Sequence, residues 1–241
     1  MEMNFNHGPA MLLADQAFLF KRSVREAAFR HKVYATFMAK PMEHEPGSSM
    51  HIHQSILEAK TGRNLFATKN GKDSKLFHHY IAGLQKHLPA VMPLLAPNVN
   101  SYRRLTPYSD APINTHWGYD NRTVGLRVPH SEPADRRVEN RLAGADANPY
   151  LAIAASLACG YLGMTEKLKV RAPVQGSAYR LAHTLPRTQY DALSRFNASR
   201  AIKTLFGERF VDAVTLVKNT ELRAYQQVIS SWEREHLLLN V

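Results

Sequence analysis

The chain has 241 residues, of which 44% are hydrophobic, and a net charge of +11. This length and composition exclude a disordered chain and fit one large or two small globular domains. No run of 18 or more apolar residues occurs, the start lacks the pattern of a secretory signal, and Cys159 is the only cysteine, so we expect no membrane span, no internal disulfide and a cytoplasmic location.

The first part of the chain predicts a helix followed by strands. Apolar side chains recur on one side of residues 9–32, and a proline suits the first turn, so this segment is predicted to be helical. Residues 33–40 are rich in β-branched and aromatic residues, and residues 50–56 alternate between polar and apolar. Each of these is predicted to be a strand, and "KTGRNLF" indicates a turn into a further short strand.

The middle of the chain predicts a helix, a long loop and two more strands. Residues 74–95 are predicted to be helical, with Ser74 as the N-cap and Pro89 ending or kinking the helix. The loop that follows is too long and too rich in special residues for a plain connector, so we regard it as a candidate functional loop. Residues 123–129 and 136–142 are then predicted strands.

The last part of the chain predicts mainly helix. Pro149 opens a buried helix in the apolar run "NPYLAIAASLACGYLG", where the cysteine is expected to behave as a small hydrophobic residue. Helices are predicted through most of 188–240, the last over about 208–238. The order of elements therefore predicts an α+β fold, with helices beside a sheet of short strands.

Three of the predicted strands, 50–56, 123–129 and 136–142, are expected to be sheet neighbours with one polar face. Side chains alternate along a strand, so residues spaced by two share a side. The polar residues in or beside these strands are His51, His53, Arg122, Arg127, Arg137, Glu139 and Arg141. Such a face is costly to bury unless its charges are paired or a ligand brings opposite charge. The alternative, a solvated face with ordinary ion pairs, fits less well because three segments repeat the pattern.

The positive charge near these strands comes from arginine alone. Seven arginines lie between Pro97 and Ala145, whereas no lysine occurs between Lys86 and Lys167. Guanidinium groups bind carboxylate and phosphate through paired hydrogen bonds, so we favour small anionic ligands over a nucleic-acid backbone. Imidazole with carboxylate suits Mg²⁺ or Mn²⁺. A divalent ion with several arginines, but without a P-loop or protein-kinase motif, indicates phosphoryl transfer of another kind.

Several motifs follow one another along nearly the whole chain: "MEMNFNHGPAMLLADQ", "PGSSMHIHQS", "NSYRRLTPYSDAP", "NRTVGLRVP", "RRVENRLAGADANPYLA" and "WEREHLL". In this order they resemble the C-terminal catalytic part of the glutamine synthetase family. The residues within the motifs are most similar to those of the γ-glutamylpolyamine synthetase (glutamate–putrescine ligase) branch. The resemblance implies an antiparallel curved sheet with flanking helices. It also implies that ATP phosphorylates the γ-carboxylate of glutamate, and that ammonia or an amine attacks the resulting γ-glutamyl phosphate.

The resemblance further implies roles for individual residues. His51 and Glu139 match ligands of one of two catalytic ions, Mg²⁺ or Mn²⁺, and Glu2 matches a ligand of the other ion. The ATP site is matched by His53, Ser55, Arg127 and Arg137. The glutamate site is matched by Gly47, Arg104 and Arg141. Groups that act on the reacting atoms are matched by Arg122, at the transferred phosphoryl group, by Arg141, at the acyl phosphate, and by Asp110.

Two positions depart from the family pattern. Asp110, in "YSDAP", stands where ammonium-using members carry a longer glutamate, so the acceptor pocket is expected to be wider or reshaped. Asp110 is predicted to take a proton from the attacking amine; the alternative is that it only caps a turn. The second departure is "EPG" (45–47), where ammonia-using members usually show Asn-Gly. Both departures concern the acceptor or the pose of glutamate.

The match begins inside a motif, so we expect residues 1–241 to be one N-terminally truncated catalytic domain, with the β-grasp domain and the first catalytic strands absent. An exposed sheet edge, an unfilled metal site and weak or no activity of the chain alone are then expected, as is a homo-oligomeric ring for the full-length protein. No nucleic-acid or membrane partner is expected. The alternatives are an inactive member kept as a binding or regulatory protein, a ligase for ethanolamine or aniline, and a basic nucleic-acid-binding module.

Overall fold

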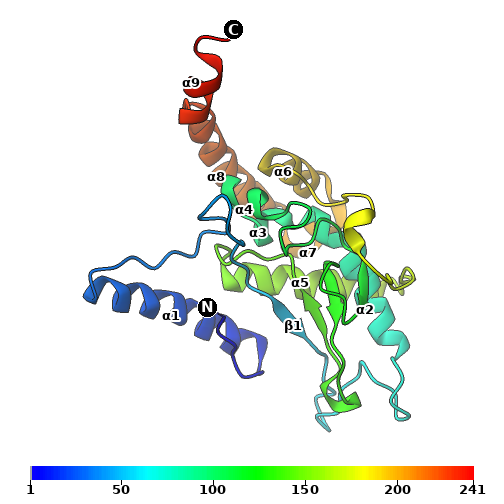
Figure 1. The fold of residues 1–241 in the computed structure, drawn as a ribbon. Coiled ribbons are helices and arrows are strands. Elements are labelled where there is room, and N and C mark those ends of the chain that lie inside the picture. The colour runs from blue at the N-terminus through cyan, green and yellow to red at the C-terminus, as the bar shows by residue number, and fades with distance from the viewer. Residues whose placement is uncertain (1) are drawn as a thin grey trace.

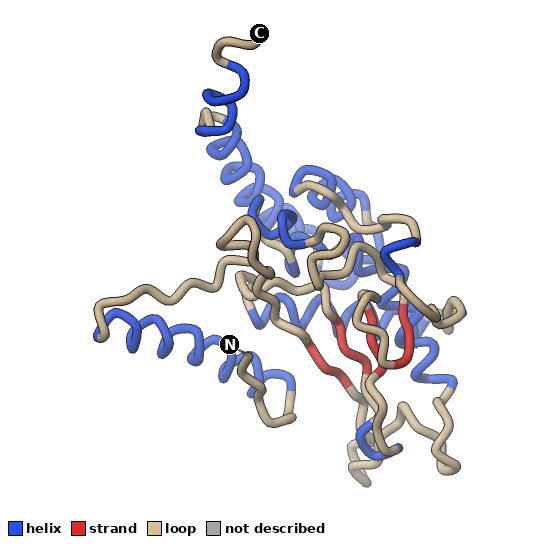
Figure 2. Tube along the Cα trace, viewed as in Figure 1, coloured by secondary structure: helices blue, strands red, loops and turns tan. Residues whose placement is uncertain are grey.

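The structure, a computed structural model, describes residues 2–241 and contains a small sheet with helices packed behind it (Figures 1 and 2). The strands are β1 (Ile52–Gln54), β2 (Trp117–Tyr119), β3 (Leu126–Val128) and β4 (Val138–Asn140). The helices are α1 (Ala10–Arg30), α2 (Lys75–His87), α3 (Met92–Leu95), α4 (Val99–Arg104), α5 (Pro149–Thr165), α6 (Gln189–Ala198), α7 (Arg200–Phe206), α8 (Glu208–Gln226) and α9 (Ser231–Leu237). Short 3₁₀ turns lie at Leu88–Ala90, Pro133–Asp135 and Ala178–Arg180. The predicted α+β class is confirmed.

The four strands lie in the order β1-β4-β3-β2. β4 pairs antiparallel with β1 and with β3, so the three predicted strands are neighbours, as expected. β2 pairs with β3 in parallel and was not predicted. It lies inside the long loop and has three residues, too few for an alternating pattern to mark it.

The predicted strand at 33–40 is wrong, because this segment has no strand partner among residues 2–241. It crosses from the far end of α1 back to the body of the protein (Figure 1), with Tyr34 98% exposed. At its end, the backbone N–H of Lys40 donates to the side chain of Asn100 rather than to another strand. The expected strand in "KTGRNLF" is reduced to an isolated bridge between Leu57 and Asn64. Strand propensity is realised only where a neighbouring strand accepts the backbone hydrogen bonds.

Most predicted helices are confirmed. Ser74 caps α2 by accepting a hydrogen bond from the backbone of Phe77 at 3.1 Å, and Pro89 lies in the 3₁₀ turn between α2 and α3. The single helix predicted over 208–238 is wrong. The chain breaks between α8 and α9, where Ser230 starts α9 with a capping box. α8 and α9 project from the body toward the C-terminus (Figure 1).

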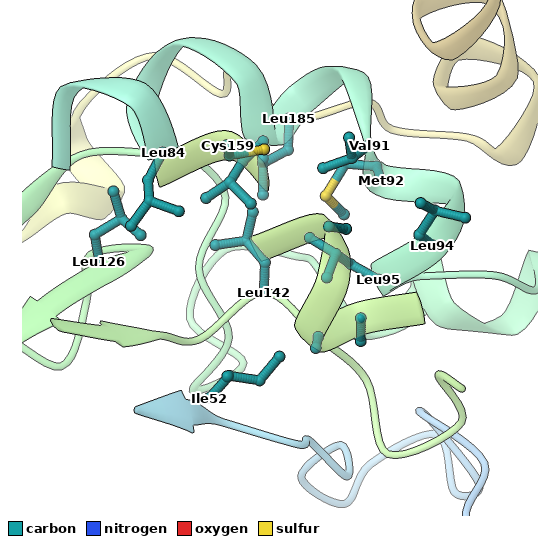
Figure 3. Packing of buried hydrophobic residues seen from close by; sticks show 14 of the residues in the cluster. Ile52, Leu84, Val91, Met92, Leu94, Leu95, Leu126, Leu142, Cys159 and Leu185 are labelled. Atoms are coloured by element: carbon teal, nitrogen blue, oxygen red, sulfur yellow. The ribbon is translucent and has the colours of Figure 1, made fainter. Parts of the chain in front are cut away.

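The core lies between the sheet and the pair α2 and α5 (Figure 3). Cys159 of α5 is fully buried beside leucines from α2 and the sheet, which confirms the prediction of a small buried hydrophobic residue. The two helices approach so closely that a Cβ built on Gly160 would lie 2.1 Å from the ring of Tyr80. Because one face of the sheet is sealed by these helices, the charged side chains of the strands and His53 occupy the other face.

Helices with the combined length and apolar character needed to cross a bilayer do not occur among residues 2–241.

Candidate active site

The outer face of β1, β4 and β3 gathers imidazole, carboxylate and guanidinium groups. In β1 the buried residues Ile52 and Gln54 flank His53, which points the other way. The register places His53 and Arg127 on either side of Glu139 in adjacent strands. The polar face predicted from alternation is therefore present, and Glu139 lies at its centre.

Glu139 is almost fully enclosed, with 3% of its side chain exposed. Its Oε1 lies 3.0 Å from His51 Nδ1 and accepts a hydrogen bond from Arg141 Nη1 at 3.0 Å, while Oε2 accepts one from Arg127 Nη1 at 2.9 Å. Burial of the Glu139 carboxyl opposes its ionisation, but the hydrogen bonds from His51 and Arg127 and the charge of Arg141 outweigh it and hold the pKa well below its usual range. The carboxylate is thus charged and paired.

Arg127 is held between two carboxylates. Its Nη2 donates to Asp120 Oδ1 at 2.5 Å, opposite the bond to Glu139. Asp120 adopts a left-handed backbone conformation with φ +46°, which is uncommon for a residue other than glycine. Asp120 was not predicted as a site residue, since it precedes the alternating strand and no local pattern marks it.

The residues matched to the ATP site lie along one side of the face. Arg137 Nε donates to His53 Nδ1 at 3.3 Å, and burial together with nearby arginines lowers the pKa of His53 although Glu139 opposes the shift. Ser55 follows two residues after His53 and is exposed. Just before β4, next to Arg137, Arg136 forms a partly buried ion pair with an aspartate that is far away in the sequence.

That aspartate is Asp73, just before α2, and its Oδ2 also accepts a hydrogen bond from the hydroxyl of Tyr119 at 2.6 Å. Asp73 and Arg136 are separated by 63 positions in the sequence, so local pattern could not connect them. Their pairing ties the loop before α2 to the first residue of the arginine-rich strand segment.

The residues matched to the glutamate site meet at the end of β4. Arg104 is buried, with 2% exposed, and donates through Nη2 to the backbone oxygen of Leu142. Burial lowers the pKa of Arg104 to about 10, against the opposing charge of Asp146. A Cβ built on Gly47 would lie 2.5 Å from Arg104 Cγ, so only glycine lets the chain pass this close.

Asp110 and Arg122 are both exposed. The backbone oxygen of Asp110 accepts a hydrogen bond from Arg141 Nη2 at 3.4 Å, which brings its loop next to Glu139 and Arg141. The turn there is closed by Ser109, whose hydroxyl donates to backbone oxygens of Arg104 and Thr106. Among residues 2–241 no hydrogen bond or ion pair joins Arg122 to the rest of the face.

A divalent metal would find two donors in contact, the imidazole of His51 and the carboxylate of Glu139. Both donor types suit Mg²⁺ or Mn²⁺. Within the described part of the chain no group of three or more histidine, cysteine, aspartate or glutamate residues could hold a metal ion. Glu2 is exposed, and no ion pair connects it to the other two residues in that part of the chain. The two donors therefore fit as part of a metal site, and the structure does not bring Glu2 to them.

Comparison with known proteins gives a consistent result. The family described as "Glutamine synthetase, catalytic domain" matches residues 1–237. Gamma-glutamylputrescine synthetase PuuA of Escherichia coli (strain K12) is 42% identical over 99% of this chain and 51% of the relative, and glutamate–isopropylamine ligase of a Pseudomonas species is 37% identical over 96% and 52%. The solved structure "GmaS/ADP complex-Conformation 1" has a TM-score of 0.89 and 31% identity, covering 98% of this chain and 56% of that one. The chain spans about half the length of the curated relatives it matches.

Proposed function

The chain belongs to the glutamine synthetase family, and we propose that it is part of an ATP-dependent ligase that joins the γ-carboxylate of glutamate to an amine. The proposed reaction passes through γ-glutamyl phosphate. The proposal covers residues 1–241 as one partial catalytic domain of a cytoplasmic protein that assembles as a homo-oligomeric ring. Relatives named for putrescine, isopropylamine and ethanolamide products favour an organic amine as the acceptor.

The observation that carries the proposal is the enclosed Glu139 with its three cationic or imidazole partners on an outward sheet face. A carboxylate is a poor electrophile, and phosphorylation makes it a good one. Such a step requires that negative charge on phosphate and on the acyl group be neutralised by fixed groups. Guanidinium groups already held in place by carboxylates lose little freedom when an anion binds.

We assign the nucleotide to the side of the face that carries His53, Ser55, Arg127 and Arg137. Arg127 is fixed at both ends of its guanidinium group, and Arg137 is oriented through His53. The similarity to a structure titled as an ADP complex supports this assignment. His51 and Glu139 would hold the divalent ion, which would neutralise phosphate charge when bound. Glu2 is proposed as a ligand of a second divalent ion.

We assign glutamate to the side where Gly47, Arg104 and Arg141 meet. Arg104 offers a buried cation for a carboxylate, and the absence of a side chain at Gly47 lets the chain pass close against Arg104. Arg122, which is exposed, would neutralise charge on the transferred phosphoryl group. Asp110 would accept the proton that the amine loses on attack, because its loop lies against Arg141.

The test is an assay of ADP release by the purified chain with Mg²⁺-ATP, glutamate and one amine at a time. The amines are ammonia, putrescine, isopropylamine and ethanolamine, and the product is identified by mass spectrometry. We expect amide formation that requires both glutamate and an amine, slow for these 241 residues alone, and abolished in Glu139→Gln. The matched control is Glu235→Gln, an exposed glutamate of α9, which should match the wild type.

Calorimetric titration of Mg²⁺-ATP separates the alternatives. Nucleotide binding without turnover under any acceptor would favour the inactive binding or regulatory protein. Failure to bind nucleotide, together with nucleic-acid binding that falls steeply with salt, would overturn the proposal in favour of the basic nucleic-acid-binding module.

A further inference from the structure

The loop that joins β1 to α2, residues 55–74, lies against the residues that lead into β4, at one end of the sheet (Figure 1). We propose that Asn64 and Asp73 of this loop are positioning residues, which hold the Arg137 guanidinium group where it can meet the phosphates of a nucleotide. The inference rests on the proposed function, because that function assigns the nucleotide to the side of the face that carries Arg137.

Asn64 holds the backbone on both sides of Asp135. Its side-chain nitrogen donates to the backbone oxygen of Ala134 at 2.9 Å and to that of Arg136 at 2.8 Å, and its side-chain oxygen accepts from the backbone of Phe66 at 2.9 Å. Asn64 is buried, with 6% exposed, so little water competes for these bonds. Because the amide nitrogen has only two hydrogens, both are committed to this one segment.

The loop itself is anchored in the core. Phe66, two residues after Asn64, is fully buried, and the centroid of its ring lies 4.6 Å from that of Phe77 and 5.0 Å from that of Tyr80, both in α2. A side chain packed in this way has little freedom to move. Asn64 therefore fixes the segment before β4 relative to α2.

Asp73 holds the side chain of Arg136, whose backbone is held by Asn64. The Asp73 carboxylate, with 7% of its side chain exposed, forms an ion pair with Arg136 Nη1, while its Oδ2 accepts a hydrogen bond from the hydroxyl of Tyr119 at 2.6 Å. Arg136 Nη2 also donates to the backbone oxygen of Gly71, in the same loop, at 3.4 Å. The residue next to Arg136 therefore starts from a fixed point in the backbone.

That residue, Arg137, depends on this support more than the other arginines of the face do. Arg127 and Arg141 each form an ion pair with Glu139. Among residues 2–241 no carboxylate pairs with Arg137. Its Nη1 donates instead to the backbone oxygen of Asp135 at 3.2 Å, within the segment that the loop holds. A guanidinium group without a carboxylate keeps its full charge for a phosphate, but this long side chain is positioned only if its backbone and its acceptor are fixed.

Nuclear magnetic resonance of the chain with isotope-labelled arginine tests the support without any ligand. In the wild type, Arg137 Nε donates to His53 Nδ1 at 3.3 Å, and the Nε–H signal is identified by its loss in Arg137→Lys. We expect hydrogen exchange of this group with water to be about tenfold faster in Asn64→Ala and in Asp73→Asn, because the guanidinium group then leaves its acceptor for part of the time.

Asn114→Ala is the matched control. Asn114 is buried as Asn64 is, donates to the backbone oxygen of Ala178 at 3.0 Å and accepts from the backbone of His116 two residues later. Its replacement removes the same kinds of hydrogen bond and should lower stability in the same way. It should leave hydrogen exchange at Arg137 unchanged, because Asn114 does not contact the segment before β4.

Calorimetric titration then measures what the support contributes to nucleotide binding. Asn64→Ala should raise the Kd of Mg²⁺-ATP about tenfold. The Kd of adenosine should stay the same, since only the phosphates would reach Arg137. In an Arg137→Met background, Asn64→Ala should cause no further loss of ATP affinity, because the group that Asn64 positions is already absent.

An unchanged exchange rate at Arg137 in the folded variants would overturn the inference. So would a loss of ATP affinity as large in the Arg137→Met background as in the wild type, because Asn64 would then support the fold in general. Circular dichroism confirms that each variant is folded, and Asp73→Asn, which keeps the size of the side chain, replaces Asn64→Ala in the titration if the latter does not fold. A wild type that binds no nucleotide, with the expected change in exchange, would count against the proposed function alone.

Discussion

Replacing Glu139 by glutamine removes one charge from the centre of the polar face and keeps the size of the side chain. In the wild type its two oxygens accept from Arg127 at 2.9 Å and from Arg141 at 3.0 Å. Glutamine has one oxygen, and its amide nitrogen would face a guanidinium donor. At least one arginine of the face would then lose its charged acceptor.

The size of the effect follows from burial. Arg141 has 8% of its side chain exposed and Glu139 has 3%, so their ion pair is screened little by water. Removing one partner of a buried pair is destabilising by about 3–5 kcal/mol. Arg127 keeps Asp120 as a second acceptor, so we expect the lower limit, about 3 kcal/mol. For a chain of this size that lowers Tm by about 6–12 °C.

Acid should remove the same contribution from the wild type. The pKa of Glu139 lies below its ordinary value of 4.5 in the folded chain, because the hydrogen bonds from His51 and Arg127 outweigh burial. The unfolded chain therefore binds the proton first as pH falls below that value, and folding becomes less favourable. The stabilisation is complete above about pH 4.5 and declines on further acidification, whereas Glu139→Gln should lack this part of the acid dependence.

Thermal unfolding followed by circular dichroism at pH 7, and again across the acid range, measures both effects. Glu235→Gln removes an exposed glutamate of α9 and should change stability by no more than about 0.5 kcal/mol. A Glu139→Gln protein as stable as the wild type at pH 7 would refute this reasoning. It would mean that the cost of removing these charged groups from water equals the attraction between them.

Three further changes test other parts of the structure. Gly47→Ala places a Cβ 2.5 Å from Arg104 Cγ, so we expect the free energy of unfolding, measured in urea, to fall by about 1–3 kcal/mol. Calorimetry should also show weaker glutamate binding, and an unchanged glutamate affinity would contradict the assignment of Gly47 to the glutamate site. Gly160→Ala places a Cβ 2.1 Å from the Tyr80 ring and should lower stability by at least as much, without a specific effect on ligands. Burial lowers the pKa of Lys21 to about 8, so the unfolded chain binds more protons above that pH and stability should rise toward pH 10. Lys21→Met should abolish this rise, and a Tm that falls equally in both proteins between pH 8 and 10 would disprove it.

Several features of the molecule could be predicted because they depend on neighbours in sequence. Ser74 caps α2 through a hydrogen bond to a residue three positions later, and Pro149 occupies the first turn of α5 after Asn148. The alternation in β1 and β4 directed His53 and Glu139 to the same face, whichever elements surrounded them. The order of the motifs along the chain indicated the glutamine synthetase family, which the comparisons confirm.

Other features depended on how distant segments meet. Residues 33–40 have the composition of a strand but remain unpaired, since propensity supplies no partner. β2 pairs only because the long loop returns beside β3. Asn64, Asp73 and Asp120 carry no local pattern, yet each fastens a residue of the polar face or of the segment just before β4.

The sequence by itself determined the class of fold and the side of each strand that carries the polar groups, because helix and strand periodicity are local properties of the backbone. Tertiary structure decided which carboxylate meets which guanidinium group. These contacts join residues many positions apart, and their geometry is set by packing of α2 and α5 behind the sheet, which no short stretch of sequence encodes.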